Sequence, residues 1–293
     1  MGELIRYVAR MPGKRIRPAL ALLSAKLVSE GLMEGPIRLA VAVELIHTAT
    51  LLHDDVIDGA SLRRGLSTLN AKWGNTLSVL SGDYLYSKAF CLLSSLESPG
   101  VLKLMSETAR ILCEGEVAQI HHQYNTALSR AQYLKIIRAK TASLMSACAQ
   151  AGALLAGAAP RQALRLSQFG LQFGLAFQVL DDTQDLVGDE AALGKSLGTD
   201  AALGNITLPL IALMESGAAD VSKRLAAWYG NGHSPAAEVE LLTLLREEAI
   251  RHKIPQACRR LAGRFLDRSR AALEPFPDSR PKESLLALTD YLL

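Results

Sequence analysis

Residues Leu45–Asp58 read LIHTATLLHDDVID, an apolar run that ends in an aspartate cluster of the form DDxxD. The same form recurs at Asp181–Asp185, behind the apolar run Phe169–Leu180. On a helix, residues i and i+4 share a face and lie ~6 Å apart along the axis. Each cluster therefore aims at least two carboxylates in one direction from the end of an apolar segment.

These carboxylates repel one another, and divalent cations would relieve the repulsion. Mg²⁺ suits such a site because it binds a few carboxylates together with substrate phosphates. One DDxxD alone is equally well explained as a solvated acidic helix end, whereas two copies near basic residues favour a metal site. The predicted ligands of Mg²⁺, for which Mn²⁺ is an alternative ion, are Asp54, Asp55, Asp58, Asp181, Asp182 and Asp185.

Basic residues accompany both clusters. Arg63-Arg64-Gly65 follows the first cluster, and Lys195 comes ten residues after the last aspartate of the second. Arginine offers phosphate a two-pronged hydrogen-bond donor, and lysine offers a point charge. Carboxylates, Mg²⁺ and fixed cations together predict a site for diphosphates.

The chain resembles the trans-isoprenyl diphosphate synthases of the polyprenyl synthetase family, most of all the long-chain octaprenyl-type synthases. The resemblance covers nearly the whole chain, through stretches that occur in family order. These are Gly13–Pro18 (GKRIRP), His47–Asp55 (HTATLLHDD), Arg63–Gly65, Gly82–Leu85 (GDYL), Glu114–Glu116, Lys140–Ala142, Phe177–Asp182 (FQVLDD), Gly194–Lys195 and Thr207–Leu210 (TLPL). It implies an all-α fold of the isoprenoid synthase type, a single large helical bundle around a deep central cavity.

The resemblance also implies a reaction, in which isopentenyl diphosphate is joined to an allylic diphosphate to give a longer trans-polyprenyl diphosphate. The residues that it assigns to the allylic diphosphate are Arg63, Lys140 and Lys195. Those that it assigns to isopentenyl diphosphate are Lys14, Arg17, His47 and Arg64. Lys140, Thr141 and Gln178 would face the reacting carbons, where carbonyl and hydroxyl dipoles steady a cation.

Several of these residues also have a purely structural explanation. Without the resemblance, Lys14 and Arg17 would belong to an exposed basic turn, and His47 would be a partly buried histidine. Thr141 would serve equally well in a cap or a helix-to-helix hydrogen bond. The family also normally carries a lysine just before Thr-Leu-Pro, where this chain has Asn205.

Breakers such as Pro12-Gly13 and Gly35-Pro36 cut the chain into helix-length pieces. Long helices are predicted over Ile37–Asp58, Thr76–Ser95, Val101–Tyr124, Arg130–Ala156 and Arg161–Leu186, and a break within the fourth is left open. The alternating apolar residues of Phe169–Leu180 also fit a strand, and the resemblance decides for a buried helix. No turn-rich linker divides the chain, which predicts one domain over residues 1–293.

Composition limits the function and the location. A net charge of +3 over 293 residues is too small to indicate nucleic-acid binding. The N-terminus lacks a signal-peptide pattern, and no uncharged apolar window is long enough for stable membrane insertion, so a soluble cytoplasmic protein is predicted. The cysteines form no CxxC and are predicted to be buried free thiols of a reducing compartment. They are Cys91, Cys113, Cys148 and Cys258. The resemblance to the family also implies that the protein is a homodimer.

Rival functions are weaker. Gly194-Lys195-Ser196 resembles the end of a nucleotide-binding P-loop, but Asp189 stands where that motif requires glycine. A non-catalytic subunit of a heteromeric prenyl synthase typically loses aspartates or the arginine pair, and this chain keeps all of them. A terpene cyclase would need no second diphosphate site such as the one predicted at Lys14 and Arg17.

Product length has one indicator. In the family, bulky residues at the fourth and fifth positions before the first aspartate limit the product, and here those positions are Thr50 and Ala49. Their small size predicts a long-chain product, with a farnesyl or geranylgeranyl diphosphate synthase as the alternative. The residue that stops growth would then lie deeper, with Ile120 and Gln123 as candidates.

Overall fold

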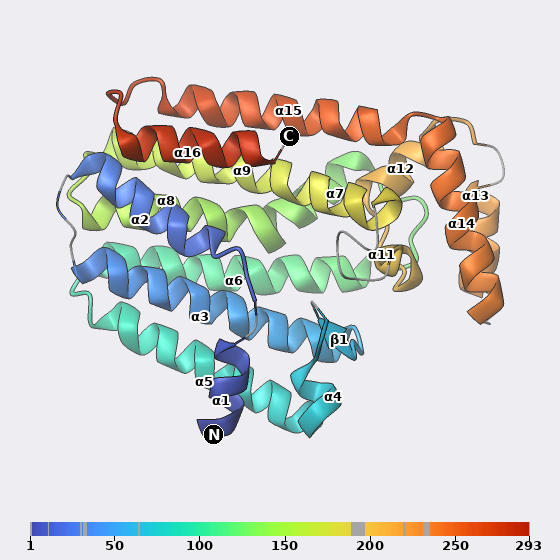
Figure 1. Ribbon diagram of the computed structural model, residues 1–293, viewed down its shortest axis with the longest axis horizontal. Coiled ribbons are helices and arrows are strands. Elements are labelled where there is room, and N and C mark those ends of the chain that lie inside the picture. The colour runs from blue at the N-terminus through green and yellow to red at the C-terminus, as the bar shows by residue number, and fades with distance from the viewer. Residues whose placement is uncertain are drawn as a thin grey trace. The chain divides into compact units, whose positions relative to one another are not determined.

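The computed structural model describes residues 2–10, 12–29, 31, 34–63, 65–188, 197–218, 221–230 and 235–292. Almost all of these residues lie in helices, and the only strands among them form a short hairpin (Figure 1), which confirms the prediction of an all-α protein. They group into two compact units. Unit 1 comprises Met1–Arg110, Leu144–Gly170 and Ala272–Leu288, and unit 2 comprises Ile111–Ser143, Leu171–Ala271 and Thr289–Leu293.

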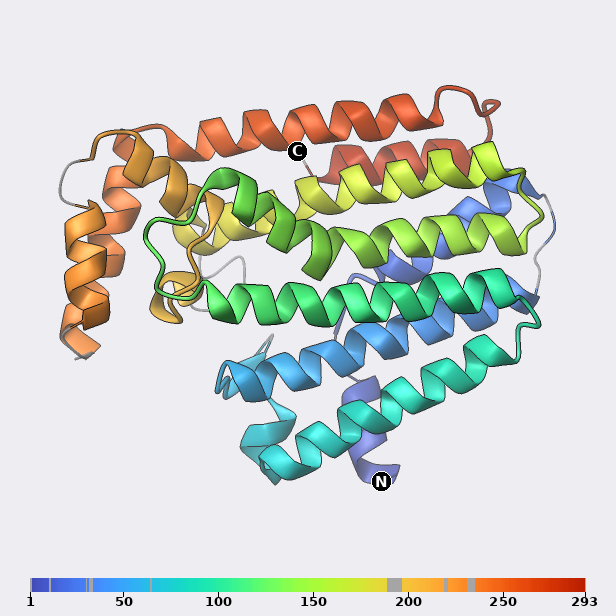
Figure 2. The same cartoon turned by 180° about the vertical axis from the view of Figure 1, so that it is seen from behind.

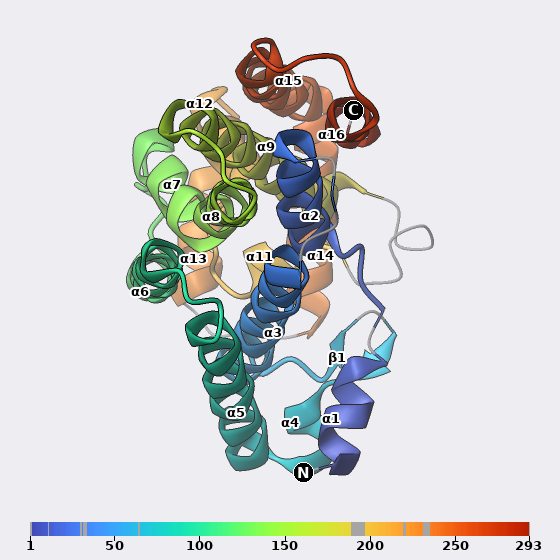
Figure 3. The ribbon, with the colours of Figure 1, turned by 90° about the vertical axis from the view of Figure 1, so that its left-hand side faces the viewer.

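Unit 1 is built around helix α3 (Glu34–Ile57), which packs along α2 (Ile16–Val28) and α5 (Asn75–Ser94). Figure 3 shows α3 beside both of these helices. Strands β1 (Leu62–Arg63) and β2 (Leu66–Ser67) pair antiparallel, with Leu62 opposite Ser67. The other elements of unit 1 are α1 (Gly2–Ala9), α4 (Leu69–Trp73), α8 (Ser143–Leu155), the first part of α6 (Pro99–His121), the first part of α9 (Pro160–Val187) and most of α16 (Arg280–Tyr291).

The aspartate-bearing end of α3 rests on a hydrophobic core cluster. Leu4 and Val8 of α1, Ala49 and Leu52 of α3, Leu69 of α4 and Leu85 of α5 are all buried there. At ~25 cal/mol per Å² of apolar surface, such burial stabilises each large side chain by about 1.5–3 kcal/mol. This packing fixes the position and direction of the last turn of α3, which carries the aspartates.

Unit 2 contains the second halves of α6 and α9 and most of α15 (Ile254–Leu273). Its other elements are α7 (Arg130–Ile137), a π-helical turn (Arg138–Ala142), α11 (Thr199–Ala202), α12 (Leu208–Glu215), α13 (Val221–Gly230) and α14 (Pro235–Arg251). Helices α12, α13 and α14 pack on one another (Figure 2, amber to orange), and α12 also contacts α7. An ion pair of 2.5 Å between Arg130 and Glu215 joins α7 to the end of α12.

The predicted helices are confirmed with small shifts of their ends. The segment Phe169–Leu180 is helical within α9, and Gly170 permits close approach there. A Cβ atom at Gly170 would lie 2.4 Å from the carbonyl oxygen of Met145 in unit 1, so only glycine fits there. The fourth predicted helix is indeed interrupted, by the π-helical turn at Arg138–Ala142. Helices α6, α9, α15 and α16 each contribute residues to both units. Whether the two units form a single domain, as the sequence predicts, stays a prediction.

Two of the cysteines differ from the prediction in their exposure. All four cysteines are free, but Cys91 and Cys113 are exposed, so the prediction of four buried thiols was wrong for them. On α5 the buried positions Leu85, Ala89 and Leu93 define a face that leaves Cys91 outside.

Among the described helices, α3 is long and apolar enough to cross a membrane by length and composition alone. Buried core helices of soluble proteins pass the same test.

Candidate functional site

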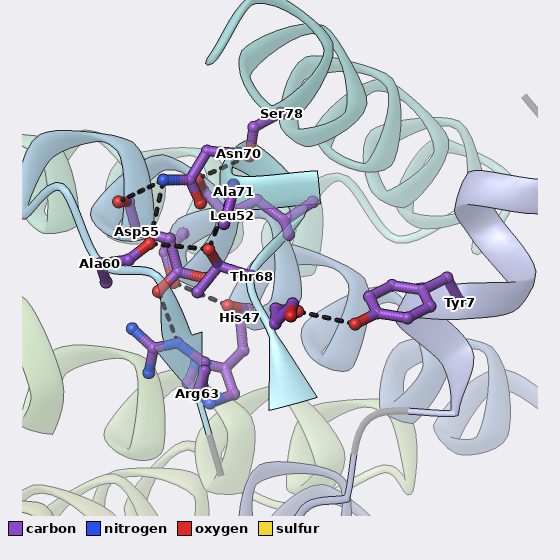
Figure 4. Close-up of polar contacts among 12 residues, drawn as sticks. Tyr7, His47, Leu52, Asp55, Ala60, Arg63, Thr68, Asn70, Ala71 and Ser78 are labelled. Carbon is purple, nitrogen blue, oxygen red and sulfur yellow. Dashed lines mark hydrogen bonds and ion pairs between the residues drawn. The ribbon is translucent and has the colours of Figure 1, made fainter. Parts of the chain in front are cut away.

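The first aspartate cluster lies at the end of α3. Asp54 and Asp58 are half-buried, whereas Asp55 is only 1% exposed. The Nε of Arg63, on β1, donates to Oδ1 of Asp55 over 2.7 Å (Figure 4). The backbone carbonyl of Asp55 accepts from the Asn70 amide and from the backbone N–H of Ala60. The middle aspartate of this cluster is therefore held inward by the hairpin and by α4.

The two oxygens of the Asp55 carboxylate differ in their hydrogen bonding. Its Oδ2 is buried and has no hydrogen-bond partner among the described residues. Burial raises the pKa of Asp55, while the charge and hydrogen bond of Arg63 act in the opposite direction. A buried carboxylate oxygen without a donor is what an oxygen-binding cation or an ordered water would satisfy.

The basic turn before α2 is tied to α3. Arg15 occupies a left-handed backbone conformation with φ of 50°, which is uncommon for a residue with a side chain. Its guanidinium forms an ion pair with Glu44 of α3. This pair holds the segment that carries Lys14, which is exposed, and Arg17, which is half-buried.

Arg17 and His47 lie next to each other, as a shared site requires. The Nη1 of Arg17 is 3.1 Å from Nε2 of His47. Because a guanidinium can only donate, the imidazole nitrogen accepts, and the ring proton of His47 then sits on Nδ1. The ring is thereby fixed in one tautomer beside the cation.

The second aspartate cluster, at the end of α9, resembles the first in its first two members, but its last aspartate is buried as well. Asp181 is half-buried. Asp182 and Asp185 are 4% and 3% exposed. The Thr199 hydroxyl and the Asp200 backbone N–H donate to the two oxygens of Asp185 over 2.7 and 3.1 Å. Asp185 thereby anchors the start of α11 to the end of α9.

Asp182 is the centre of a buried polar chain. The Tyr133 hydroxyl donates to its Oδ2 over 2.5 Å, and Nε2 of Gln178 donates to its Oδ1 over 2.7 Å. The Thr141 hydroxyl in turn donates to Oε1 of Gln178 over 2.7 Å. Burial raises the pKa of Asp182 to about 7, and the hydrogen bonds from Tyr133 and Gln178 oppose that rise.

The π-helical turn carries Lys140 and Thr141, and π-turns inside helices frequently mark functional sites. The turn is approached closely by α6, because a Cβ atom at Gly115 would lie 2.7 Å from the backbone nitrogen of Lys140. Nζ of Lys140 lies 2.6 Å from Oε2 of the next residue, Glu116, with which it forms an ion pair. Gly115 thus allows α6 to pack closely against the turn, and Glu116 pairs with the lysine of that turn.

Asn205 is buried in a cluster of amides. The side-chain amides of Gln119 and Gln123 both lie 3.4 Å from its Oδ1, and its own backbone N–H donates to the Asp200 carbonyl over 2.8 Å. The position that is normally lysine in the family is therefore occupied by a neutral, well-partnered side chain.

The donor set suits a divalent cation, although the ligands are not gathered within either unit. Among the described residues, no three His, Cys, Asp or Glu side chains lie together closely enough to hold an ion. Asp54 and Asp58 lie one helical turn apart on α3, and Oδ2 of Asp55 has no hydrogen-bond partner among the residues that the structure describes, so this turn offers the oxygen donors that a hard divalent cation binds.

A match to known proteins decides the family. The family model described as polyprenyl synthetase matches residues 1–245. The chain belongs to the polyprenyl synthetase family. It is 38% identical to the octaprenyl diphosphate synthase of Haemophilus influenzae over 289 residues, which cover 98% of this chain and 86% of that one. The octaprenyl diphosphate synthase of Escherichia coli is also 38% identical, over 98% of this chain and 88% of its own.

A solved structure of the polyprenyl synthetase family has the same fold. The polyprenyl synthase from Caulobacter crescentus, complexed with calcium and isoprenyl diphosphate, superimposes with a TM-score of 0.90 and 38% identity, over 96% of this chain and 84% of that one. The relatives are polyprenyl and octaprenyl diphosphate synthases, and the chain is a prenyltransferase of this class with the all-α isoprenoid synthase fold.

The structure brings some of the predicted site residues into contact with one another and pairs another with a different partner. Arg17 with His47, Arg63 with Asp55, and Thr141 with Gln178 and Asp182 are brought together, each set within one unit. Lys140 is paired with Glu116. Arg64 and Lys195 lie outside the described residues.

Sequence reasoning missed the partners that hold these side chains. They are Arg15 and Glu44 at the basic turn, Glu116 beside Lys140, and Tyr133 beside Asp182. For Tyr133 the sequence did contain one signal. A tyrosine on the apolar face of a helix needs a hydrogen-bond partner for its hydroxyl.

Proposed function

We propose that this enzyme condenses isopentenyl diphosphate with an allylic diphosphate, in a Mg²⁺-dependent reaction, to give a long-chain trans-polyprenyl diphosphate. The observation that carries this proposal is the common plan of the two aspartate clusters. In each, the second aspartate is buried and bonded to protein donors, while the first is half-buried at the end of an apolar helix. The octaprenyl diphosphate synthases among the relatives favour the long chain.

The chemistry begins when the allylic C–O bond breaks and pyrophosphate leaves with the electron pair. The double bond of isopentenyl diphosphate attacks the resulting carbocation, and a proton is then lost to the released pyrophosphate. The enzyme accelerates this sequence to the extent that it binds the departing pyrophosphate more tightly than the intact substrate. When bound, Mg²⁺ supplies Lewis-acid stabilisation of the leaving group, and Asp54, Asp58 and Asp181 are its proposed ligands. Asp55, Asp182 and Asp185 would support them.

The test is a product analysis with the purified protein alone. Labelled isopentenyl diphosphate is supplied with several allylic starters, and the chain length of the products is measured. Turnover without a second subunit excludes a non-catalytic role. Farnesyl diphosphate consumed without isopentenyl diphosphate would instead indicate a terpene cyclase, and products that stop at farnesyl or geranylgeranyl diphosphate would indicate the short-chain alternative.

Two sets of residues are proposed for two diphosphates. Lys14, Arg17, His47 and Arg64 would hold isopentenyl diphosphate, and Arg63, Lys140 and Lys195 would hold the allylic substrate. Lys14→Ala should raise the KM for isopentenyl diphosphate roughly 10- to 100-fold, because a charge-assisted hydrogen bond contributes about 1.5–3 kcal/mol. Lys195→Ala should raise the KM for the allylic diphosphate by a similar factor. Initial rates measured with one substrate varied at a time give both constants.

Lys26→Ala is the matched control for these two variants, since Lys26 is an exposed lysine of α2 outside both sets. Arg63→Ala is less suitable, because it would also leave the buried Asp55 carboxylate without its cation. If Lys14→Ala and Lys195→Ala changed both KM values equally, the division between the two diphosphates would be wrong.

We also propose that the enzyme is a cytoplasmic homodimer that folds as one domain. Its free cysteines suit a reducing compartment. Leu77, Leu80 and Tyr84 lie on one face of α5 and are 41%, 54% and 36% exposed. An apolar stripe of this kind is a candidate interface.

Light scattering at micromolar concentration is expected to give twice the mass of one chain. The double variant Leu77→Glu/Leu80→Glu should give the monomer mass, because two buried charges at the interface would lack partners. Leu164→Glu is the control, as Leu164 is an equally exposed leucine on α9, at 55%. A wild-type monomer, or a dimer that the double variant leaves intact, would contradict this assignment of the interface.

A further inference from the structure

Tyr133 is the one member of the buried polar chain that no part of the proposed reaction uses. Its side chain is 3% exposed, and its hydroxyl donates to Asp182. We propose that Tyr133 is a positioning residue, which holds Asp182 so that Gln178 and Thr141 offer lone pairs rather than protons to the allylic substrate. This inference rests on the proposed prenyl transfer and extends it by one residue.

The backbone of Tyr133 is fixed before its side chain acts. Ser129 begins α7 with a capping box, in which its hydroxyl accepts from the Gln132 N–H and the Gln132 side chain accepts from the Ser129 N–H. The Tyr133 N–H then donates to the Ser129 carbonyl over 3.0 Å. A capping box satisfies two backbone donors that the start of a helix otherwise leaves open, so α7 starts at a defined residue.

The polarity of the chain follows from donor and acceptor chemistry. Because the phenol of Tyr133 occupies Oδ2 of Asp182, Oδ1 is turned toward Gln178. An ionised carboxylate only accepts, so the NH₂ group of Gln178 points to Oδ1 of Asp182. The amide oxygen of Gln178 then points away from Asp182, where it accepts the Thr141 proton.

The consequence lies at Thr141. A hydroxyl has one proton, and in this chain that proton is committed to Gln178, which leaves only lone pairs for a ligand. Lone pairs present the negative end of the hydroxyl dipole, which stabilises a carbocation, whereas a free proton would repel it. Preorganised dipoles aimed at developing charge are among the largest contributions to catalysis.

The first measurement is the kinetics of Tyr133→Phe, which removes one oxygen atom and keeps the buried ring. We expect kcat to fall roughly tenfold, the effect of about one hydrogen bond in the transition state, with the KM for both substrates unchanged. Tyr229→Phe is the matched control in unit 2, because the Tyr229 hydroxyl also donates to protein, to the Ala201 carbonyl over 3.0 Å, but outside this chain. Its kcat should equal that of the wild type.

A double-mutant cycle separates positioning from simple loss of structure. In a Gln178→Met background, Tyr133→Phe should lower kcat no further, since the residue through which it acts is already gone. An additional tenfold loss there, or a rise in KM together with the fall in kcat, would overturn the positioning role.

Crystal structures of the wild type and Tyr133→Phe supply a readout that needs no turnover. We expect the Gln178 side chain to leave its bonds to Asp182 and Thr141 in the variant, while α7 stays in place. If the wild type lacked prenyltransferase turnover, the proposed function would fail, and the position of Gln178 would still decide the role of Tyr133. An unmoved Gln178 with an unchanged kcat would overturn the inference.

Discussion

Replacing Asp54 or Asp181 with alanine is expected to lower turnover by a factor of roughly 10²–10³ while the helices stay folded. Each side chain is half-buried at the end of an apolar helix, so its removal relieves charge repulsion rather than creating a cavity in the core. The reaction loses a proposed ligand of the ion that stabilises the departing pyrophosphate. Steady-state rates at saturating substrates measure the loss, and thermal unfolding followed by circular dichroism measures the fold.

Asp278→Ala is the matched control for these variants. Asp278 is an aspartate whose side chain is 97% exposed, paired with Lys282 outside both clusters, and its loss should leave turnover unchanged. Chelation should abolish the wild-type activity, and added Mg²⁺ should restore it. Full activity of either Asp54→Ala or Asp181→Ala would exclude that residue as a ligand.

Thr50→Phe is expected to convert a long-chain product into a short-chain one. Thr50 lies four residues before Asp54, about 40° from it around the helix axis, and is half-buried. A prenyl chain that grows away from the diphosphate along this face of α3 would meet the aromatic ring about 6 Å below the aspartate, within roughly one isoprene unit. Chromatography of the products from labelled isopentenyl diphosphate measures the change in length.

Ala49 has a different position from the one its spacing suggested. It lies about 140° from Asp54 around the helix, and it is fully buried in the core cluster with Leu4, Val8 and Leu69. Ala49→Phe would overpack that core and destabilise the protein by about 1–3 kcal/mol, so it is a poor test of product length.

Thr48→Phe is the better comparison for Thr50→Phe, since Thr48 is half-buried on the same helix and about 120° from Asp54. An unshortened product from Thr50→Phe, or equal shortening by both variants, would show that this face of α3 does not limit growth. Of the deeper candidates, Ile120 is 41% exposed and Gln123 is engaged with Asn205.

The sequence predicted the helices well because their apolar spacing and their breakers are local signals. Glycine punctuation and DDxxD spacing located both aspartate clusters at helix ends, where the structure has them. The π-helical turn was visible only as a break within one helix, because an extra backbone residue in a turn leaves no mark in apolar periodicity. The alternating run that fits a strand is part of helix α9, where its buried residues Phe169, Phe173 and Ala176 recur at helical spacing.

The supporting contacts of the site could not be read from the sequence for a different reason. Glu116 and Lys140 are 24 residues apart, and Tyr133 and Asp182 are 49 apart, so their pairing depends on how helices pack. The same holds for Arg15 and Glu44, whose ion pair secures a strained backbone residue. Motifs identify the residues that carry the chemistry, whereas the residues that hold them are set by tertiary structure.

The π-helical turn makes this part of the chain sensitive to insertions and deletions. Loss of one residue from Arg138–Ala142 would restore a regular α-helix and rotate Tyr133 relative to Thr141 by about 100°. Tyr133 could then no longer reach Thr141 through Asp182 and Gln178. The length of this stretch therefore matters to the buried polar chain as much as the identity of its side chains.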